Sequence, residues 1–156
     1  TANDQTAPLH RSKTFTDESL PAGNAVAARA LLTLGHLAAE PRYLAAAERT
    51  IRAAVPGMLH SPDAHAAMLL ALTDALAPPA MVILRGTPDP PVAWQRVLAE
   101  KFDPRRVTLA IPADATGLTR LLADCAPQGD ICAYMCRGTA CSLPVTDPAR
   151  LAEAMG

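Results

Sequence analysis

The residues best suited to chemistry are four cysteines that share one short stretch, Cys125, Cys132, Cys136 and Cys141. None of them forms a C-x-x-C pair, and their spacing fits neither a zinc ribbon nor a zinc finger, whose ligand pairs recur at two distant places. We therefore assign no metal ligands and expect no cofactor. Cys136 and Cys141 flank a four-residue turn that can bring two thiols close enough for a disulfide or a shared ligand. Arg137, beside Cys136, would favour its thiolate. This pair is the redox candidate.

A second interpretation of the cysteines stays open. Free cysteine is among the most commonly buried residue types, so a packed pair in a reduced protein also explains the pattern. If 131–136 is a strand, Cys132, Tyr134 and Cys136 point to one face, because side chains alternate along a strand. Cys132 and Cys136 would then lie about 13 Å apart and could not bridge.

A polar turn before the first predicted helix is the other candidate site. It contains Asp17, Pro21, Gly23 and Asn24, and polar groups at a helix N-terminus can hold an anionic or hydroxyl-rich ligand. The alternative is structural: Asn24 caps the helix while Pro21 and Gly23 form the turn.

Other catalytic patterns are missing from the sequence. Neither G-x-S-x-G nor H-E-x-x-H occurs, and the histidines show no ligand spacing. The segment 84–91 lies where a nucleotide-binding fold has its phosphate loop, but its prolines remove backbone donors, so an ordinary connection is expected. His36, in the last turn of the first predicted helix, can interact favourably with the helix C-terminus.

Hydrophobic periodicity predicts the elements that position these residues. Apolar side chains at steps of three and four predict helices over 23–39, 41–55 and 64–77. Short apolar runs then predict strands at 81–84, 107–111 and 131–136, with helical spacing between them and a last helix capped by Asp147. Alternating strands and helices favour a parallel sheet. The predicted class is α/β, a helical hairpin region followed by a small three-stranded parallel lobe.

Composition limits the functional classes. The 156 residues carry 14 basic and 15 acidic side chains, a net charge of −1, so no nucleic acid partner is expected. No apolar run is long enough for a membrane span, and no signal peptide is recognisable, so no membrane partner is expected and we predict a cytoplasmic protein. The domains would be a flexible arm at 1–16, helices at 17–79 and the α/β lobe at 80–156. The first residue, Thr1, suggests a processed chain or an excised piece.

Three motifs together resemble one family over about residues 15–156. They are Asp17–Asn24 followed by Ala25-Val-Ala-Ala28, then Met81–Gly86, then Cys136-x4-Cys141-x2-Pro144-x2-Asp147-Pro148. The family joins an N-terminal thioredoxin-like domain to a six-hairpin α/α toroid of the N-acylglucosamine 2-epimerase and glycosidase type, and ends in a small α/β segment. Where most relatives are expected to have Ser, this chain has Ala22 and Ala25, which removes two hydroxyl groups from the turn.

The resemblance implies that this chain is the C-terminal part of a longer protein. It would hold the last toroid helices and the terminal lobe, and would lack the thioredoxin-like domain with its own C-x-x-C. Its partner would be the rest of the parent chain. Pro21, Gly23 and Asn24 would belong to the rim of a carbohydrate-type pocket. Catalysis by this segment alone is not expected, and the alternative function is a thiol redox or metal-binding module that uses Cys136 and Cys141.

Overall fold

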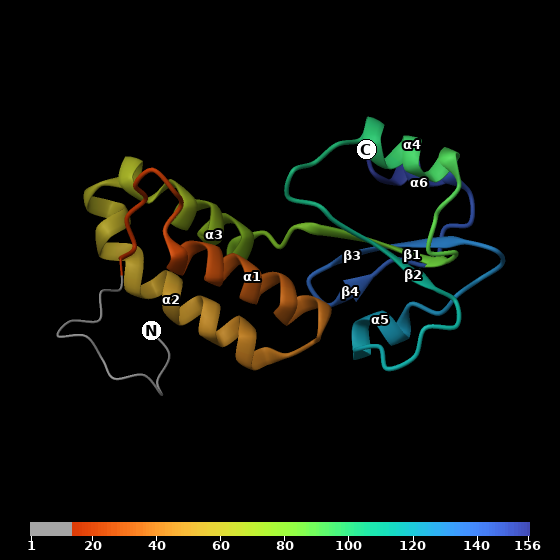
Figure 1. Cartoon of the computed structure of the whole chain (residues 1–156), viewed down its shortest axis with the longest axis horizontal. Coiled ribbons are helices and arrows are strands. Elements are labelled where there is room, and N and C mark those ends of the chain that lie inside the picture. Colours follow the sequence, from red (N-terminus) through yellow and green to blue (C-terminus); the bar gives the residue numbers. More distant parts are fainter. Residues whose placement is uncertain (1–13) are drawn as a thin grey trace. The chain divides into compact units, whose positions relative to one another are not determined.

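The computed structural model describes residues 14–156, which divide into two compact units (Figure 1). The first unit comprises the described residues up to Leu32 together with Arg42–Leu76, and the second comprises Thr33–Pro41 with Ala77–Gly156. Most of the predicted flexible arm, residues 1–13, lies outside the described residues. Within the described part, no helix has the length and hydropathy needed to cross a bilayer.

The first unit is helical. Its elements are α1 (Gly23–Leu37), whose C-terminal end belongs to the second unit, α2 (Pro41–His60), a 3-10 turn η1 (Pro62–His65) and α3 (Ala66–Leu76). The buried core takes one stripe from each helix, as the apolar spacing predicts, and consists of Ala22, Ala25, Ala28, Leu32, Ala47, Ile51, Ala54, Met58, Met68 and Ala71. Small side chains at most of these positions let the helices pack closely.

The helix boundaries differ from the prediction by one to five residues, and α1 ends at Leu37 and α3 at Leu76. α2 continues through Pro56 to His60 instead of ending at 55. A proline removes one backbone donor, but the last turn is retained because Met58 is 5% exposed in the core and the Ser61 N–H donates to the Gly57 carbonyl. The third helix was expected from residue 64, whereas its first turn is the separate 3-10 segment η1.

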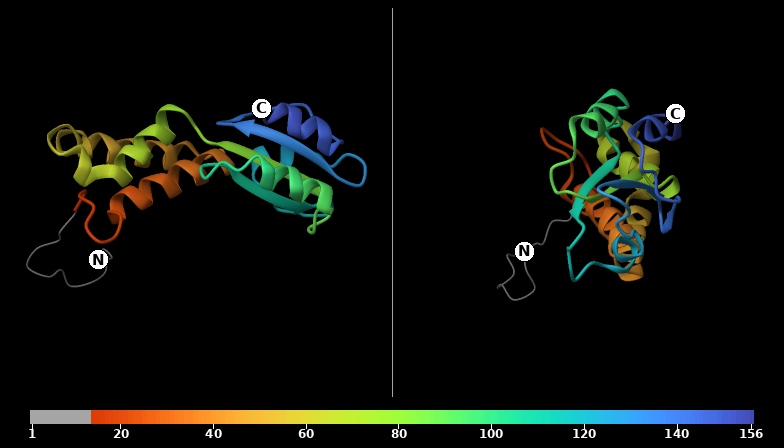
Figure 2. Two further views of the ribbon diagram at one scale, coloured as in Figure 1. Left: turned by 90° about the horizontal axis from the view of Figure 1, so that it is seen from above. Right: turned by 90° about the vertical axis from the view of Figure 1, so that its right-hand side faces the viewer.

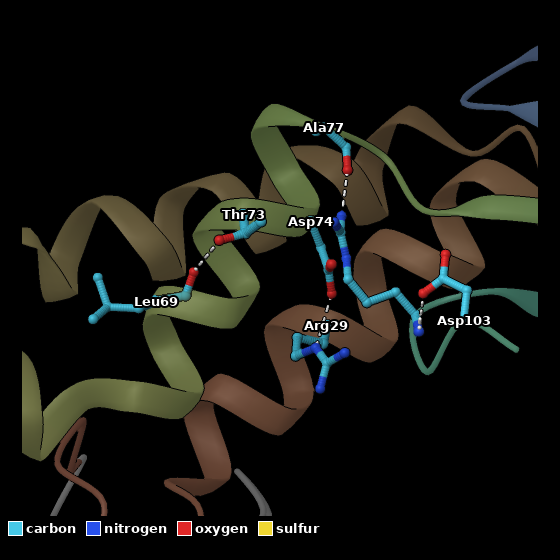
Figure 3. A network of polar contacts seen from close by, with 7 residues as sticks. Arg29, Leu69, Thr73, Asp74, Ala77 and Asp103 are labelled. Atoms are coloured by element: carbon cyan, nitrogen blue, oxygen red, sulfur yellow. Dashed lines mark hydrogen bonds and ion pairs between the residues drawn. The ribbon is translucent and has the colours of Figure 1, made fainter.

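A buried charge links two helices of this unit. Arg29 on α1 donates from Nε to Asp74 on α3 at 2.8 Å, and the Asp74 side chain is only 7% exposed (Figure 3). On the same helix Thr73 donates to the Leu69 carbonyl oxygen (Figure 3). A buried carboxylate requires such a partner, so the ion pair fixes how α1 and α3 face each other.

The second unit is a four-stranded sheet with helices on both faces (Figure 2). In chain order its elements are β1 (Ala80–Gly86), α4 (Val92–Glu100), β2 (Val107–Pro112), α5 (Arg120–Asp124), β3 (Cys132–Arg137), β4 (Ala140–Cys141) and α6 (Pro148–Ala154). Asp147 caps α6 by accepting from the Ala149 N–H at 2.9 Å, as predicted. The α/β class is therefore correct.

The prediction of a three-stranded parallel sheet is wrong. The strand order is β2-β1-β3-β4, with β1 parallel to β2 but antiparallel to β3, and β3 antiparallel to β4. The five-residue α5 spans about 7.5 Å, too little to cross back along a strand of about 20 Å. An antiparallel β3 needs no such crossing, because it begins at the end of the sheet where β2 finishes. The alternation of strands and helices in the sequence does not by itself reveal the direction of β3.

The two faces of the sheet have separate cores. Met81, Ile83, Cys132, Tyr134 and Cys136 face α5, with Leu121 and Cys125 packed over them. Val82, Leu84 and Ala133 face the opposite way, where Trp94 of α4 and Leu151 of α6 cover them. The predicted alternation along the third strand is confirmed, and it places the three residues Cys132, Tyr134 and Cys136 beneath α5.

The end of β1 depends on a glycine. Gly86 has φ +144°, which side-chain-bearing residues rarely adopt, and a Cβ there would overlap the backbone carbonyl oxygen of Asp130. We expect Gly86→Ala to destabilise this unit by about 3 kcal/mol. Gly117→Ala, at φ +70° with open space around it, should cost only about 1 kcal/mol.

The measurement is urea unfolding followed by fluorescence of Trp94, the one tryptophan, which is buried in this unit. Equal losses of stability in the two variants would contradict the close approach to Asp130.

Candidate functional site

A tight hairpin brings Cys136 and Cys141 together. β3 and β4 are antiparallel neighbours in which the two cysteines are directly paired, and Gly138, at φ +61°, occupies the first central position of the turn between them. The cysteines form a disulfide with an S–S distance of 2.01 Å and Cα atoms 4.0 Å apart. Cys136 is 2% exposed, whereas Cys141, on the short outer strand, is exposed. The disulfide therefore joins a residue of the core to a residue at the surface.

A third cysteine lies against this disulfide. Cys125 ends α5, is 1% exposed, and has its Sγ 3.9 Å from the Sγ of Cys141. The sulfurs of Cys125, Cys136 and Cys141 all lie within 4.8 Å of one another. Burial raises the pKa of the Cys125 thiol, and the charge of Arg85 partly opposes that rise. The structure thus gathers three of the four cysteines.

Cys132 is buried and packed, separate from the three-sulfur group. Its thiol points to the Ala126 carbonyl oxygen at 3.8 Å, an acceptor that also receives the Tyr134 hydroxyl at 2.6 Å. Burial raises the pKa of Tyr134, so the phenol stays protonated and donates. For Cys132 the packing interpretation of the sequence is the one the geometry supports.

Arg85 is the unexpected residue beneath α5. Its side chain is on the face of β1 that carries Met81 and Ile83, directly across from Cys132 on β3. The residue is 4% exposed, and its Nε and Nη1 atoms are buried without a hydrogen-bond partner among the described residues. A buried cation with unsatisfied donors is costly, so an anionic group nearby would stabilise it.

A cavity of about 700 Å³ borders the hairpin. Its wall includes both disulfide cysteines, Ser142, the end of α6 and the segment after α4, and its basic side chains are Lys101, Arg106 and Arg137. All of these groups belong to the second unit. The apolar wall of the cavity includes Val82 and Met135, so the cavity lies on the face of the sheet that α4 and α6 cover and reaches the hairpin from that side.

The polar turn at Asp17 is occupied by structural bonds. The two carboxylate oxygens of Asp17 accept from the N–H groups of Ala22, at 2.7 Å, and Ala67, at 2.8 Å. The Asp17 N–H also donates to the Ala64 carbonyl oxygen at 2.7 Å. These contacts, first that from Ala67 and then that from Ala22, lower the pKa of Asp17. One side chain therefore caps the starts of both α1 and α3.

The other residues of the turn have simpler surroundings. The Asn24 Nδ2 donates to the Thr14 carbonyl oxygen at 2.7 Å, so Asn24 holds the preceding loop rather than capping α1. Pro21 precedes the helix, and Gly23 begins it with open space around its Cα. A carbohydrate-type ligand at this turn stays a prediction.

His36 does not support the expected charge interaction at the end of α1. Burial lowers the pKa of its imidazole, which favours the neutral ring, and its Nδ1 has no hydrogen-bond partner among residues 14–156. A neutral ring interacts little with the helix dipole.

Sequence reasoning missed Cys125 and Arg85. The spacing of Cys125 from Cys141 carries no turn signal, because a strand and the hairpin lie between them. The predicted strand 81–84 stops before Arg85, although the position of Arg85 two residues after Ile83 places it on the same face. The two-residue alternation of side chains along a strand was the signal that could have identified Arg85.

Comparison with other proteins adds no family. No family model matches the chain, and no curated protein or solved structure matches it either.

Asp17 provides a stability prediction with a defined pH dependence. Its folded pKa lies below the ordinary 3.8, so its contribution is fully present above about pH 5 and is lost as the pH falls through the folded value. We expect Asp17→Asn to lose about 1 kcal/mol at pH 7, and less as the pH falls below 4. The neighbouring Glu18→Gln is the control.

The readouts are thermal unfolding by circular dichroism and amide hydrogen exchange at Ala22 and Ala67, whose N–H groups should exchange faster in the Asn variant. Unchanged exchange at both amides would contradict the double cap.

Proposed function

We propose that the α/β unit is a thiol–disulfide module whose working pair is Cys136 and Cys141. The observation that carries the proposal is the cross-strand disulfide, which joins a buried cysteine to an exposed one on the short outer strand. In the reducing compartment expected from the sequence, a purely structural disulfide is uncommon, and those that occur are usually transient and catalytic or redox-sensing.

The reaction follows from the exposure of the two cysteines, of which only Cys141 lies at the surface. A thiolate of a partner dithiol attacks Cys141 Sγ, the S–S bond breaks, and Cys136 leaves as a thiolate that takes up a proton. The partner's second thiol then releases Cys141, so that the partner becomes a disulfide and this chain gains two electrons and two protons. The family resemblance suggests the C-x-x-C of an upstream thioredoxin-like domain as this partner.

The test is reversible titration of the pair in thiol–disulfide buffers. We expect two alkylatable thiols in the oxidised chain, Cys125 and Cys132, and four in the reduced chain, with peptide mapping linking Cys136 to Cys141. Under denaturing alkylation Cys141→Ser should leave three free thiols in any buffer, whereas Cys132→Ser should keep the titration. Four free thiols in oxidising buffer would contradict the proposal.

For the helical unit we propose a second role, as the end of a larger helical body in which the rest of the parent chain covers it. The supporting observation is a set of large exposed aliphatic side chains on this unit: Leu20, Val26, Val55, Leu59, Leu70 and Leu76. Val55 and Leu59 are four residues apart on α2 and so share one side of it. The turn at Asp17 would then contribute Pro21, Gly23 and Asn24 to a carbohydrate-type pocket of the parent.

We expect the isolated chain to self-associate through this exposed apolar surface. Leu59 is 81% exposed, and replacing it with Gln should weaken the association five- to tenfold. This change corresponds to about 1 kcal/mol of association free energy from lost apolar burial. Sedimentation equilibrium measures the effect, and Glu48→Gln on the same helix is the control. A monomer at all concentrations would contradict the proposal.

A further inference from the structure

We propose that opening the Cys136–Cys141 disulfide creates a Zn²⁺ site in which Cys125 is the third thiolate ligand. The inference rests on the proposed thiol–disulfide function, because the site exists only in the reduced chain. Zinc binding and the disulfide would then exclude each other at the same hairpin.

The distances between the sulfurs fit this metal. A tetrahedral site with Zn–S bonds of about 2.3 Å separates its sulfurs by about 3.8 Å. The Sγ atoms of Cys125 and Cys141 are already 3.9 Å apart, and all three sulfurs lie within 4.8 Å. Only the 2.01 Å separation of Cys136 and Cys141 must widen after reduction. Since these residues stay paired on β3 and β4, rotation of their side chains is enough.

The same distances disfavour direct attack of Cys125 on the disulfide. Thiol–disulfide exchange needs the three sulfurs in line, which would place Cys125 and Cys136 apart by the sum of the other two distances, about 5.9 Å. They are no more than 4.8 Å apart. The sulfurs therefore form a triangle, as ligands around one ion do.

The charge of the surroundings also fits. Three thiolates and one Zn²⁺ have a net charge of −1, and a buried anion needs a nearby cation. The guanidinium of Arg85 is buried with two unpartnered nitrogens, and its charge acts on the Cys125 sulfur. Reduction and metal binding would give Arg85 the anionic neighbour that the oxidised form lacks.

The fourth coordination position would be open. Among residues 14–156, the group of potential ligands contains three cysteines and no fourth donor. Cys141 lies at the surface, so water or an external ligand can reach the ion there. An open position is typical of zinc sites that exchange a ligand rather than purely structural ones.

The oxidising direction needs a disulfide oxidant, such as oxidised glutathione. The thiolates of Cys136 and Cys141 give up two electrons and form their S–S bond, the oxidant is cleaved to two thiolates, and Zn²⁺ is released as its ligands are lost. The reducing direction uses a dithiol and ends with three thiolates on the metal, after their protons have been released.

The experiment is anaerobic titration of the reduced, metal-free chain with Zn²⁺ against a chromophoric chelator, and with Co²⁺ for its thiolate charge-transfer absorption. We expect one Zn²⁺ per reduced chain, none in the oxidised chain, and three thiols protected from alkylation by the metal. Cys125→Ser should weaken Zn²⁺ binding by at least tenfold and reduce the charge-transfer intensity by about a third, as one of three Co–S bonds is lost. Cys132→Ser, which replaces a buried cysteine outside the group, should bind as the parent does.

The outcomes separate this inference from the proposed function. A reversible disulfide with equal Zn²⁺ affinity in the parent and Cys125→Ser would overturn the three-thiolate site and leave the redox pair standing. If the disulfide never forms on oxidation but the reduced chain binds Zn²⁺ through Cys125, the redox proposal fails while the metal site holds. Oxidative formation of the Cys136–Cys141 disulfide in Cys125→Ser shows that the variant has folded around the hairpin.

Discussion

The antiparallel pairing of β3 with β1, followed by the turn back into β4, is the constraint on which the thiol site depends. It sets Arg85 across from Cys132 and Cys136 across from Cys141, all by register alone. Because side chains alternate along a strand, the same register places Cys132, Tyr134 and Cys136 on the face that α5 covers. In the parallel alternative β3 would run the other way and this register would be lost.

The short helix α5 supplies the third sulfur as a consequence of the same topology. A connection that need not cross the sheet can be brief, and Cys125, the residue after α5, packs over the face carrying Cys136. The covering layer buries Arg85, Cys125 and Cys136, whereas Cys141 is exposed. The fold therefore places a cation and two buried cysteines on one face of the sheet, where the interaction between charges is stronger than at the surface.

Much of this arrangement could be predicted from the sequence. The strand direction and the roles of Cys125 and Arg85 could not, each for a physical reason. Apolar periodicity locates the helices and the strand 107–111, and the alternation around Tyr134 gives the correct facing. The four-residue turn makes a link between Cys136 and Cys141 possible, but the sequence does not distinguish it from a packed pair of free thiols. The direction of β3 relative to β1 could not be predicted, because an apolar run looks the same in a parallel and an antiparallel strand. Cys125 could not be paired with Cys141, because their proximity arises from tertiary packing. Arg85 was missed because a charged residue after an apolar run usually marks the end of a strand.

The two candidate sites differ in what their polar atoms already do. At Asp17 both carboxylate oxygens are bonded to backbone N–H groups of two helices, so the turn is needed for folding whether or not a ligand binds. Beneath α5, Arg85 has two buried donor atoms with no hydrogen-bond partner among residues 14–156, and at the hairpin Cys141 is an exposed residue. Unsatisfied buried polarity is uncommon in a fold, and one reason for it is another state of the protein that satisfies it. The neighbouring three-sulfur group offers that other state, because reduction converts a neutral disulfide into thiolates beside the cation.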